Sequence, residues 1–230
     1  MRTFAAYDAH ADWYEGFVQD SWPYMDRVRG LLAELLGPGD GRCLDLCCGG
    51  GAHAATIAAL GWVPVGVDLS LGQLRHARDR LPAVAGDARR LPVRSNSLAA
   101  VACVLAHTDL PDYAAVVAEA VRVLRPGGCL IHVGLHPCFV GAFADWSDPG
   151  RVIIDTRYAD RGLAFDGPPH GVRVRVGAWH LPLADLLGTF LAAGLGIERV
   201  AESTANGIAD VFAVRAVKVI RGQAGQSGGW

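Results

Sequence analysis

Three aspartates lie within or directly after apolar segments of the sequence, and one of them comes shortly before a run of glycines. Asp45 precedes Gly49–Gly51, Asp68 closes the next apolar segment, and Asp87 follows the third. Glycines between a strand and a helix let the backbone approach a ligand closely, because no Cβ is in the way. A carboxylate at the end of the second strand can accept hydrogen bonds from both hydroxyls of a ribose. The pattern therefore predicts a site for a nucleoside.

Two features of this loop favour a nucleoside that carries no phosphate. The Gly-Lys-Ser/Thr ending of a P-loop is absent, so no lysine reaches toward a phosphate. Asp45 would repel a pyrophosphate but attract an amino group. Asp68 nonetheless fits loosely the acidic residue of a dinucleotide fingerprint, so an NAD-dependent oxidoreductase stays open as the alternative from another class.

The elements that position these aspartates alternate between strand and helix from residue 40 to about residue 135. Expected strands cover 42–47, 63–67, 83–85, 98–105 and 129–135, and two more are expected near 196–202 and 209–219. Helices are expected at 52–60, 71–81, 112–124 and 184–193. Alternation of this kind indicates a parallel sheet wrapped by right-handed crossovers. The expected fold class is α/β, with a doubly wound, mostly parallel, seven-stranded sheet.

The segments outside this core have other expected roles. Residues 1–36 read as helical and form an N-terminal helical cap. Residues 136–180 contain Pro, Gly and many charges with little periodicity, which indicates an insertion after the fifth strand, on the substrate side. We expect one domain over 1–220, with its cofactor-binding core at 40–135, and a flexible tail at 221–230.

Composition and charge exclude several classes of protein. Hydrophobic residues make up 51% of the 230 residues and charged residues 19%, so the chain is globular and not disordered. The formal net charge is −2 and no run of Lys or Arg occurs, which argues against nucleic acid as a partner. No apolar stretch approaches the ~20 residues that span a bilayer, and no export signal is visible, so no membrane partner is expected. The six cysteines form no Cys-x-x-Cys pair and read as reduced thiols, so the expected location is cytoplasmic.

A family resemblance rests on four segments that follow one another in order. Residues 44–51 read Leu-Asp-Leu-Cys-Cys-Gly-Gly-Gly, which resembles motif I of the class I S-adenosylmethionine-dependent methyltransferases. The departure from that motif is Cys47, which replaces the first glycine. Val-Asp-Leu-Ser at 67–70, Gly-Asp-Ala-Arg-Arg-Leu-Pro at 86–92 and Arg-Pro-Gly-Gly at 125–128 resemble further landmarks of the family. The implied fold is the Rossmann-like methyltransferase fold, and the implied cofactor is S-adenosyl-L-methionine.

The resemblance implies a role for each residue around the first strand and in the N-terminal helix. Asp45 and the backbone from Gly49 to Gly51 would hold the methionine part of the cofactor, which would sit against the Cys47 side chain. Tyr14 resembles a tyrosine that, in small-molecule methyltransferases, reaches the cofactor carboxylate from the leading helix.

The adenosine part of the cofactor falls, by the same resemblance, to the second and third strands. Asp68 would take the ribose hydroxyls, with Leu69 and Gln73 packing near the ribose and the adenine. Asp87 would accept a hydrogen bond from the adenine amino group, and Ala88 would lie beside the ring.

Two histidines follow strands at the edge where ligands of open α/β sheets bind. Ala106 and His107 end the fourth strand and would face the sulfonium, so His107 is the first candidate for a catalytic base and Asp109 a candidate partner for it. His136, after the fifth strand, is the second candidate. A metal site is the alternative role for these histidines, because His132, His136 and Cys138 would lie on one side of an extended chain. No fourth ligand is evident, so no metal is expected.

The end of the fourth strand also bears on the methyl acceptor. Residues 105–108 read Leu-Ala-His-Thr and lack the Asn/Asp-Pro-Pro-Tyr/Phe sequence of many methyltransferases that act on nucleic acids or protein amides. We therefore expect methyl transfer to a small molecule of the kind met in secondary metabolism, to oxygen first, with nitrogen or carbon open. A protein of the same fold that binds the cofactor for non-methylating, cyclase-like chemistry is the second alternative. A monomer or homodimer is expected.

Overall fold

A seven-stranded sheet forms the centre of the computed structural model, which describes residues 5–219. The strands lie in the order β10-β11-β5-β4-β1-β2-β3. Their bounds are β1 Arg42–Leu46, β2 Val63–Asp68, β3 Ala83–Ala85, β4 Leu98–Val104, β5 Leu124–Leu135, β10 Leu195–Ala205 and β11 Ile208–Lys218. The first five run parallel, and β11 pairs antiparallel with both β5 and β10. The predicted doubly wound, mostly parallel sheet is confirmed.

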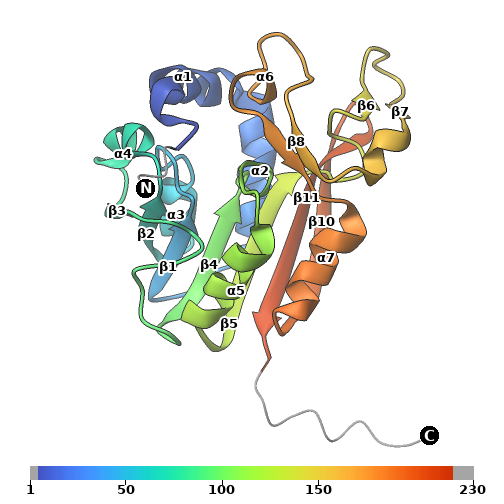
Figure 1. Ribbon diagram of the computed structural model, residues 1–230. Helices are drawn as coiled ribbons and strands as arrows, with labels where there is room; N and C mark the ends of the chain where they lie inside the picture. The colour runs from blue at the N-terminus through green and yellow to red at the C-terminus, as the bar shows by residue number, and fades with distance from the viewer. Residues whose placement is uncertain (1–4, 220–230) are drawn as a thin grey trace, which may run out of the picture.

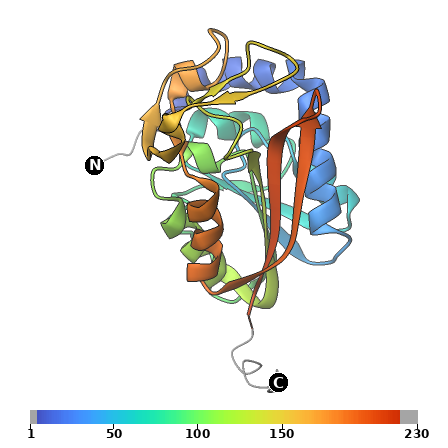
Figure 2. The same ribbon diagram turned by 90° about the vertical axis from the view of Figure 1, so that its right-hand side faces the viewer.

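Helices cover both faces of this sheet. Their bounds are α1 Ala11–Asp20, α2 Trp22–Leu36, α3 Ala54–Ala59, α4 Leu71–Ala77, α5 Tyr113–Val123 and α7 Leu183–Ala192. α2 and α3 pack on one face and α5 and α7 on the other, as Figure 1 and the turned view in Figure 2 show. Alternate residues of the central strands serve the two cores: Ala100 and Ala102 face α2, whereas Val101 and Cys103 face α5 and α7. Because helices cover both faces of the sheet, the ends of its strands are held in fixed positions.

Two elements begin or end away from their predicted positions. β5 begins at Leu124 and not at 129, because the Arg-Pro-Gly-Gly segment stays in the strand through a shift of register between Leu98 and Ala100 of β4. α4 stops at Ala77, short of the predicted residue 81, and a turn follows it.

The segment 136–180 holds short elements that its composition did not predict. These are β6 Ala144–Asp145, β7 Ile153–Ile154, η3 Thr156–Ala159, β8 Gly162–Ala164, α6 Arg173–Val176 and β9 Ala178–His180. β6 pairs with β7, and β8 pairs with β9, each antiparallel. In Figure 1 these elements lie above the carboxyl ends of the strands, across from α1.

The remaining expectations about organisation stand as follows. Within residues 5–219, no helix is long and apolar enough to cross a membrane. All six cysteines are free thiols. The predicted tail 221–230 lies outside the described residues, and the domain boundaries and the cytoplasmic location stay predictions.

Candidate functional site

A cavity of about 430 Å³ lies at the carboxyl ends of β1, β2 and β4. Its walls come from the loop after β1, the end of β2, the segment after β3, the turn after β4 and the N-terminal segment. The predicted cofactor residues on its wall are Tyr14, Cys47, Gly49, Asp68, Leu69, Gln73, Asp87, Ala88 and Ala106. The structure thus brings together residues from five segments of the chain, at the edge where open α/β sheets bind ligands.

The loop after β1 turns sharply through residues with left-handed backbone. Cys47 has φ +60°, Gly49 has +51° and Gly51 has +79°. The turn that a first glycine would make is therefore made by cysteine, which costs about 1–2 kcal/mol in this region. Leu105, at the matching end of β4, has φ +56°. Such strain gathers at functional sites, and both residues line the cavity.

Asp68 is held in place by the backbone of two loops. Its Oδ2 accepts a hydrogen bond from the Gly49 amide and its Oδ1 one from the Ser70 amide, each at 2.8 Å. Burial raises the pKa of this carboxyl, although the backbone hydrogen bonds act to lower it. Since a carboxylate offers about four lone-pair sites, two stay free for ligand hydroxyls.

Gln73 is the strongest sign that a polar ligand belongs in the cavity. Its side chain is 2% exposed and lines the cavity, yet neither the amide nitrogen nor the amide oxygen has a hydrogen-bond partner. Buried amide groups are nearly always paired. Asp87 faces the same cavity from the segment after β3, with its carboxylate bonded to Arg89 at 2.7 Å, and this bond lowers the pKa of Asp87.

Two predicted cofactor residues do not reach the cavity wall. Asp45 points into the protein behind the loop, where burial raises its pKa to about 7 and its Oδ2 has no partner. Gly51 packs against the end of α4 and the turn after it: a Cβ there would lie 3.6 Å from Ala77 Cα and 2.6 Å from Leu81 Cδ2. Asp45 and Gly51 therefore lie behind the residues that line the cavity, and their roles toward a cofactor stay predictions.

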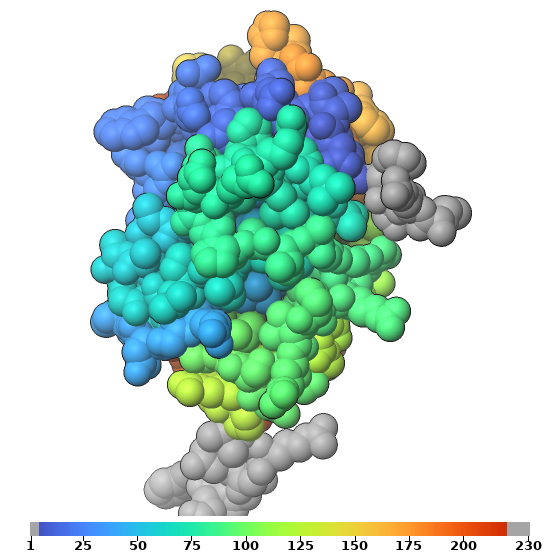
Figure 3. Space-filling model, turned by 90° about the vertical axis from the view of Figure 1, so that its left-hand side faces the viewer, coloured from blue at the N-terminus to red at the C-terminus, as the bar shows by residue number. Residues whose placement is uncertain are grey.

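The N-terminal segment closes the outer side of the cavity and is tied to the cofactor loops. Ser70 Oγ donates to Asp8 Oδ1 at 2.7 Å. Arg80 joins Glu15 of α1 at 2.5 Å and donates to the Gly50 carbonyl at 2.8 Å. Figure 3 shows this segment, in blue, resting against the blue-green surface of α4.

A second cavity, of about 910 Å³, adjoins the first. One wall is formed by α1 and α2, and the other by residues of the segment 140–178. The residues that line both cavities are Tyr7, Tyr14, Val18, Met25, Leu105, Thr108, Asp109 and Gly177. The two spaces therefore meet at the end of β4.

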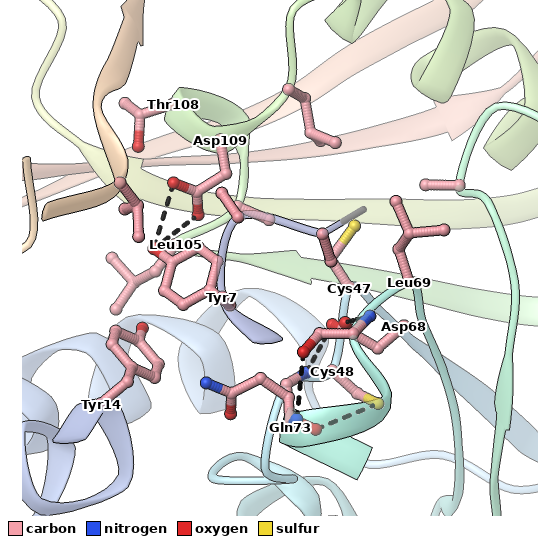
Figure 4. A pocket seen from close by; sticks show the side chains of 18 of the residues that line it. Tyr7, Tyr14, Cys47, Cys48, Asp68, Leu69, Gln73, Leu105, Thr108 and Asp109 are labelled. Atoms are coloured by element: carbon pink, nitrogen blue, oxygen red, sulfur yellow. Dashed lines mark hydrogen bonds between the residues drawn. The ribbon is translucent and has the colours of Figure 1, made fainter. Parts of the chain in front are cut away.

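Asp109 lies at this junction, a position that the sequence did not predict for it. Tyr7 donates its hydroxyl hydrogen to the carboxylate, with Oδ1 at 3.1 Å and Oδ2 at 3.2 Å. Figure 4 shows Tyr7 between Asp109 and Tyr14. Burial raises the pKa of Asp109 to about 7, even though the Tyr7 hydrogen bond acts to lower it. Asp109 had been expected as a partner of His107, but it bonds Tyr7.

His107, the first candidate base, does not line the 430 Å³ cavity, and its catalytic role stays a prediction. The ring is 5% exposed and packs on His132, with ring centres 4.9 Å apart. Its open side faces a separate pocket of about 220 Å³ under the segment 137–181. The left-handed turn at Leu105 and the 3-10 turn η2 His107–Asp109 aim Asp109 into the cavity and His107 away from it.

His136 is also turned away, and both of its ring nitrogens are engaged. Nδ1 accepts a hydrogen bond from the Cys138 amide at 3.1 Å, so the ring proton lies on Nε2, which donates to Glu202 at 2.8 Å. No nitrogen is left to act as a base. Within residues 5–219, no group of three or more His, Cys, Asp or Glu side chains is arranged to hold a metal ion.

Comparison with known proteins bears on the core of the chain. Residues 43–128 match a family described as "Methyltransferase domain". The chain is 42% identical over 97 residues to a demethylmenaquinone methyltransferase of Mycobacterium sp. (strain KMS), covering 42% of each chain. Against the enzyme of that name from Corynebacterium urealyticum it is 38% identical over 129 residues, 56% of this chain and 52% of that one. The chain thus matches about half the length of these relatives.

Solved structures extend the likeness to most of the chain. An S-adenosylmethionine-dependent methyltransferase from Mesorhizobium loti superposes with a TM-score of 0.66 at 24% identity, covering 86% of this chain and 97% of that one. This is a class I methyltransferase fold. The same fold includes the cyclase SpnF, with a TM-score of 0.62 at 18% identity over 85% of this chain and 82% of that one. The predicted fold is confirmed, and the match to a methyltransferase domain covers residues 43–128.

S-adenosylmethionine, the cofactor of this fold family, fits the residues of the 430 Å³ cavity. The free lone pairs of Asp68 suit ribose hydroxyls, and the unpartnered amide of Gln73 suits a polar group of the ligand. When bound, the cofactor supplies an electrophilic methyl group on a positively charged sulfur.

Proposed function

We propose that this protein transfers a methyl group from S-adenosylmethionine to a small, largely apolar molecule held in the 910 Å³ cavity. The observation that carries the proposal is the junction of the two cavities at the end of β4. A molecule in the larger cavity can approach the cofactor without passing through solvent. Methyl transfer is an in-line displacement, so it gains chiefly from orientation and from exclusion of water.

The lining of the larger cavity supports a ring-shaped acceptor. Aromatic side chains reach it from both walls: Tyr14, Phe17 and Tyr24 from the helices, and Trp146 from the segment after β5. Trp146 is fixed by a hydrogen bond from its Nε1 to the Phe139 carbonyl at 2.6 Å. Flat apolar walls of this kind suit a planar molecule. The relatives named demethylmenaquinone methyltransferases make a quinol ring the first acceptor class to test.

Ligand selectivity tests the cofactor part of the proposal. S-adenosylhomocysteine should raise the melting temperature, because a ligand selective for the folded state stabilises it, whereas NAD should leave it unchanged. Stabilisation by NAD alone would favour the oxidoreductase alternative. Binding of S-adenosylhomocysteine without transfer to any acceptor would favour cyclase-like chemistry, for which the likeness to SpnF gives a precedent in this fold.

A further inference from the structure

The junction of the two cavities contains one charged side chain. Among the described residues that line both spaces, Asp109 alone carries a formal charge, and the others are apolar or bear hydroxyl groups. A transferred methyl group must cross this junction, so whatever lies there meets the reacting atoms. Burying a carboxylate costs free energy unless the group is paired or hydrogen-bonded.

The carboxylate is built into the junction and is not a loose surface group. The Tyr7 hydroxyl contacts both of its oxygens, at 3.1 and 3.2 Å, and joins parts of the chain 102 residues apart. Tyr14 packs edge-on against the Tyr7 ring, with ring centres 4.9 Å apart. The strained turn at Leu105 directs the following residues into the cavity. In Figure 4 this arrangement lies beside the cofactor loop at Cys47 and Asp68.

We propose that Asp109 is the catalytic base, that Tyr7 positions its carboxylate, and that the acceptor is a hydroxy-aromatic molecule that presents an uncharged O–H group. This proposal rests on the methyltransferase function proposed above. The other candidates, His107 and His136, are turned away or fully bonded, so Asp109 is the group at the junction that can take a proton.

The reaction balances without any further reactant. The acceptor O–H bond breaks and its proton passes to Asp109, while the acceptor gains a bond to the methyl carbon. The bond between that carbon and sulfur breaks, and its electron pair stays on sulfur, which becomes neutral. In attack through a ring carbon, the same hydroxyl first passes its proton to Asp109; the hydrogen on the methylated carbon then leaves as a proton to solvent, and Asp109 returns its proton to the oxygen.

The surroundings of Asp109 make it a stronger base than an exposed aspartate. Burial raises its pKa to about 7, and the negative charge of Asp68 adds to the effect. A phenolic hydroxyl has a pKa of about 10, so the gap to be bridged in the transition state is about 3 units. The titratable groups that face Asp109 are Tyr7, Tyr14, Cys47, Asp68 and Cys103. None of them is a cation that would stabilise the ionised carboxylate.

A simple anchoring role for the Tyr7–Asp109 bond predicts different behaviour. An anchor holds the N-terminal segment, so its loss would weaken cofactor binding and turnover together, at every pH. A base controls kcat through its own ionisation, and a positioning hydroxyl that bonds the charged form shifts that ionisation. The acidic limb of the pH profile therefore separates the two roles.

The experiment compares wild type with Asp109→Asn, Tyr7→Phe and the exposed control Asp79→Asn. With naphthohydroquinone, a catechol and phenol as acceptors, Asp109→Asn should lower kcat by about 10²–10⁴-fold, with affinity for S-adenosylhomocysteine unchanged by calorimetry. Tyr7→Phe should move the acidic limb of the kcat profile to higher pH, because the lost hydrogen bond favoured the ionised form. Asp79→Asn should match wild type.

Infrared spectroscopy gives a readout that does not depend on turnover. The carbonyl band of a buried protonated carboxyl should titrate near pH 7 and should vanish in Asp109→Asn, while the band of Asp45, whose pKa is also about 7, remains. An unchanged kcat in folded Asp109→Asn, no such band, or no methylation of any hydroxy-aromatic probe by wild type that binds S-adenosylhomocysteine would overturn the inference. Failure of wild type to bind S-adenosylhomocysteine would instead overturn the proposed function.

Discussion

The walls of the two cavities are built in different ways. Around the 430 Å³ cavity, backbone groups do most of the positioning: amides of adjacent loops hold Asp68, and the turn after β1 is set by left-handed backbone. Around the 910 Å³ cavity, side chains from distant segments meet: Tyr7 bonds Asp109 at the junction, and Trp146 and Phe17 line the cavity from different segments. Backbone amides hold Asp68 whatever side chains their residues carry, whereas a wall made of side chains changes with each substitution. The cofactor half is thus generic, and the acceptor half carries the specificity.

Replacing Asp68 tests the cofactor half and should have the largest effect on cofactor affinity. Asp68→Ala removes the carboxylate that would receive the ribose hydroxyls and leaves two loop amides without their acceptor. Affinity for S-adenosylhomocysteine should fall by about 1–3 kcal/mol in calorimetry. Affinity equal to that of wild type would remove Asp68 from the site.

Replacing Asp109 should have opposite effects on stability and on activity. A carboxyl whose pKa is raised from 3.8 to about 7 in the folded state contributes stability below pH 3.8 that is lost as the pH rises through 7. Asp109→Asn has no such loss, so it should gain about 1 kcal/mol or more over wild type at pH 8, and little at pH 4. Chemical denaturation at the two pH values measures this. A variant that is less stable than wild type at pH 8 would show that the charge is well compensated.

Replacing Trp146 tests the acceptor half alone. Trp146→Ala removes a flat wall of the 910 Å³ cavity that does not line the 430 Å³ cavity. The KM for the acceptor should rise roughly fivefold, since an aromatic contact is worth about 1 kcal/mol. The dissociation constant for S-adenosylhomocysteine should not change. A matching loss of cofactor affinity would mean that the two halves are not separate.

Replacing Cys47 should have the smallest effect. Cys47→Gly relieves the left-handed strain at φ +60° but loses freedom on folding, so the free energy of unfolding should rise by less than about 1 kcal/mol. Cys47→Val should be clearly destabilising, because a β-branched residue resists this conformation. Comparing the melting temperatures of Cys47→Gly and Cys47→Val with that of wild type tests whether the backbone at Cys47 is strained.

Most residues that line the 430 Å³ cavity could be predicted from the sequence, because the motifs that contain them are short and continuous. Asp68, Leu69 and Gln73 lie within one strand-to-helix turn, and the glycines of the first loop stand beside the residues they serve. The fold followed from the alternation of strands and helices. The motif predicts that Asp45 and Gly51 hold the cofactor, whereas the structure places them behind the residues that line the cavity.

The acceptor half was not predictable because its partners are far apart in the chain. Nothing near Asp109 in the sequence indicates Tyr7, and the positive φ at Leu105 that aims Asp109 inward is unusual for leucine. His107 and His136 became candidates because each follows a strand. Sequence position does not show in which direction their side chains point. The elements of the segment 136–180 span only two to four residues, which is too short for a periodic pattern to show in the sequence.

The most direct test follows a labelled methyl group from S-adenosylmethionine to naphthohydroquinone. The wild-type protein should place the label in the quinol, in a stoichiometry of one methyl group for each S-adenosylhomocysteine formed. Asp68→Ala should lose transfer through weak cofactor binding, and Asp109→Asn should lose it with cofactor binding intact. Label that stays on the cofactor with naphthohydroquinone and with every other hydroxy-aromatic acceptor, in a protein that binds S-adenosylhomocysteine, would contradict the account.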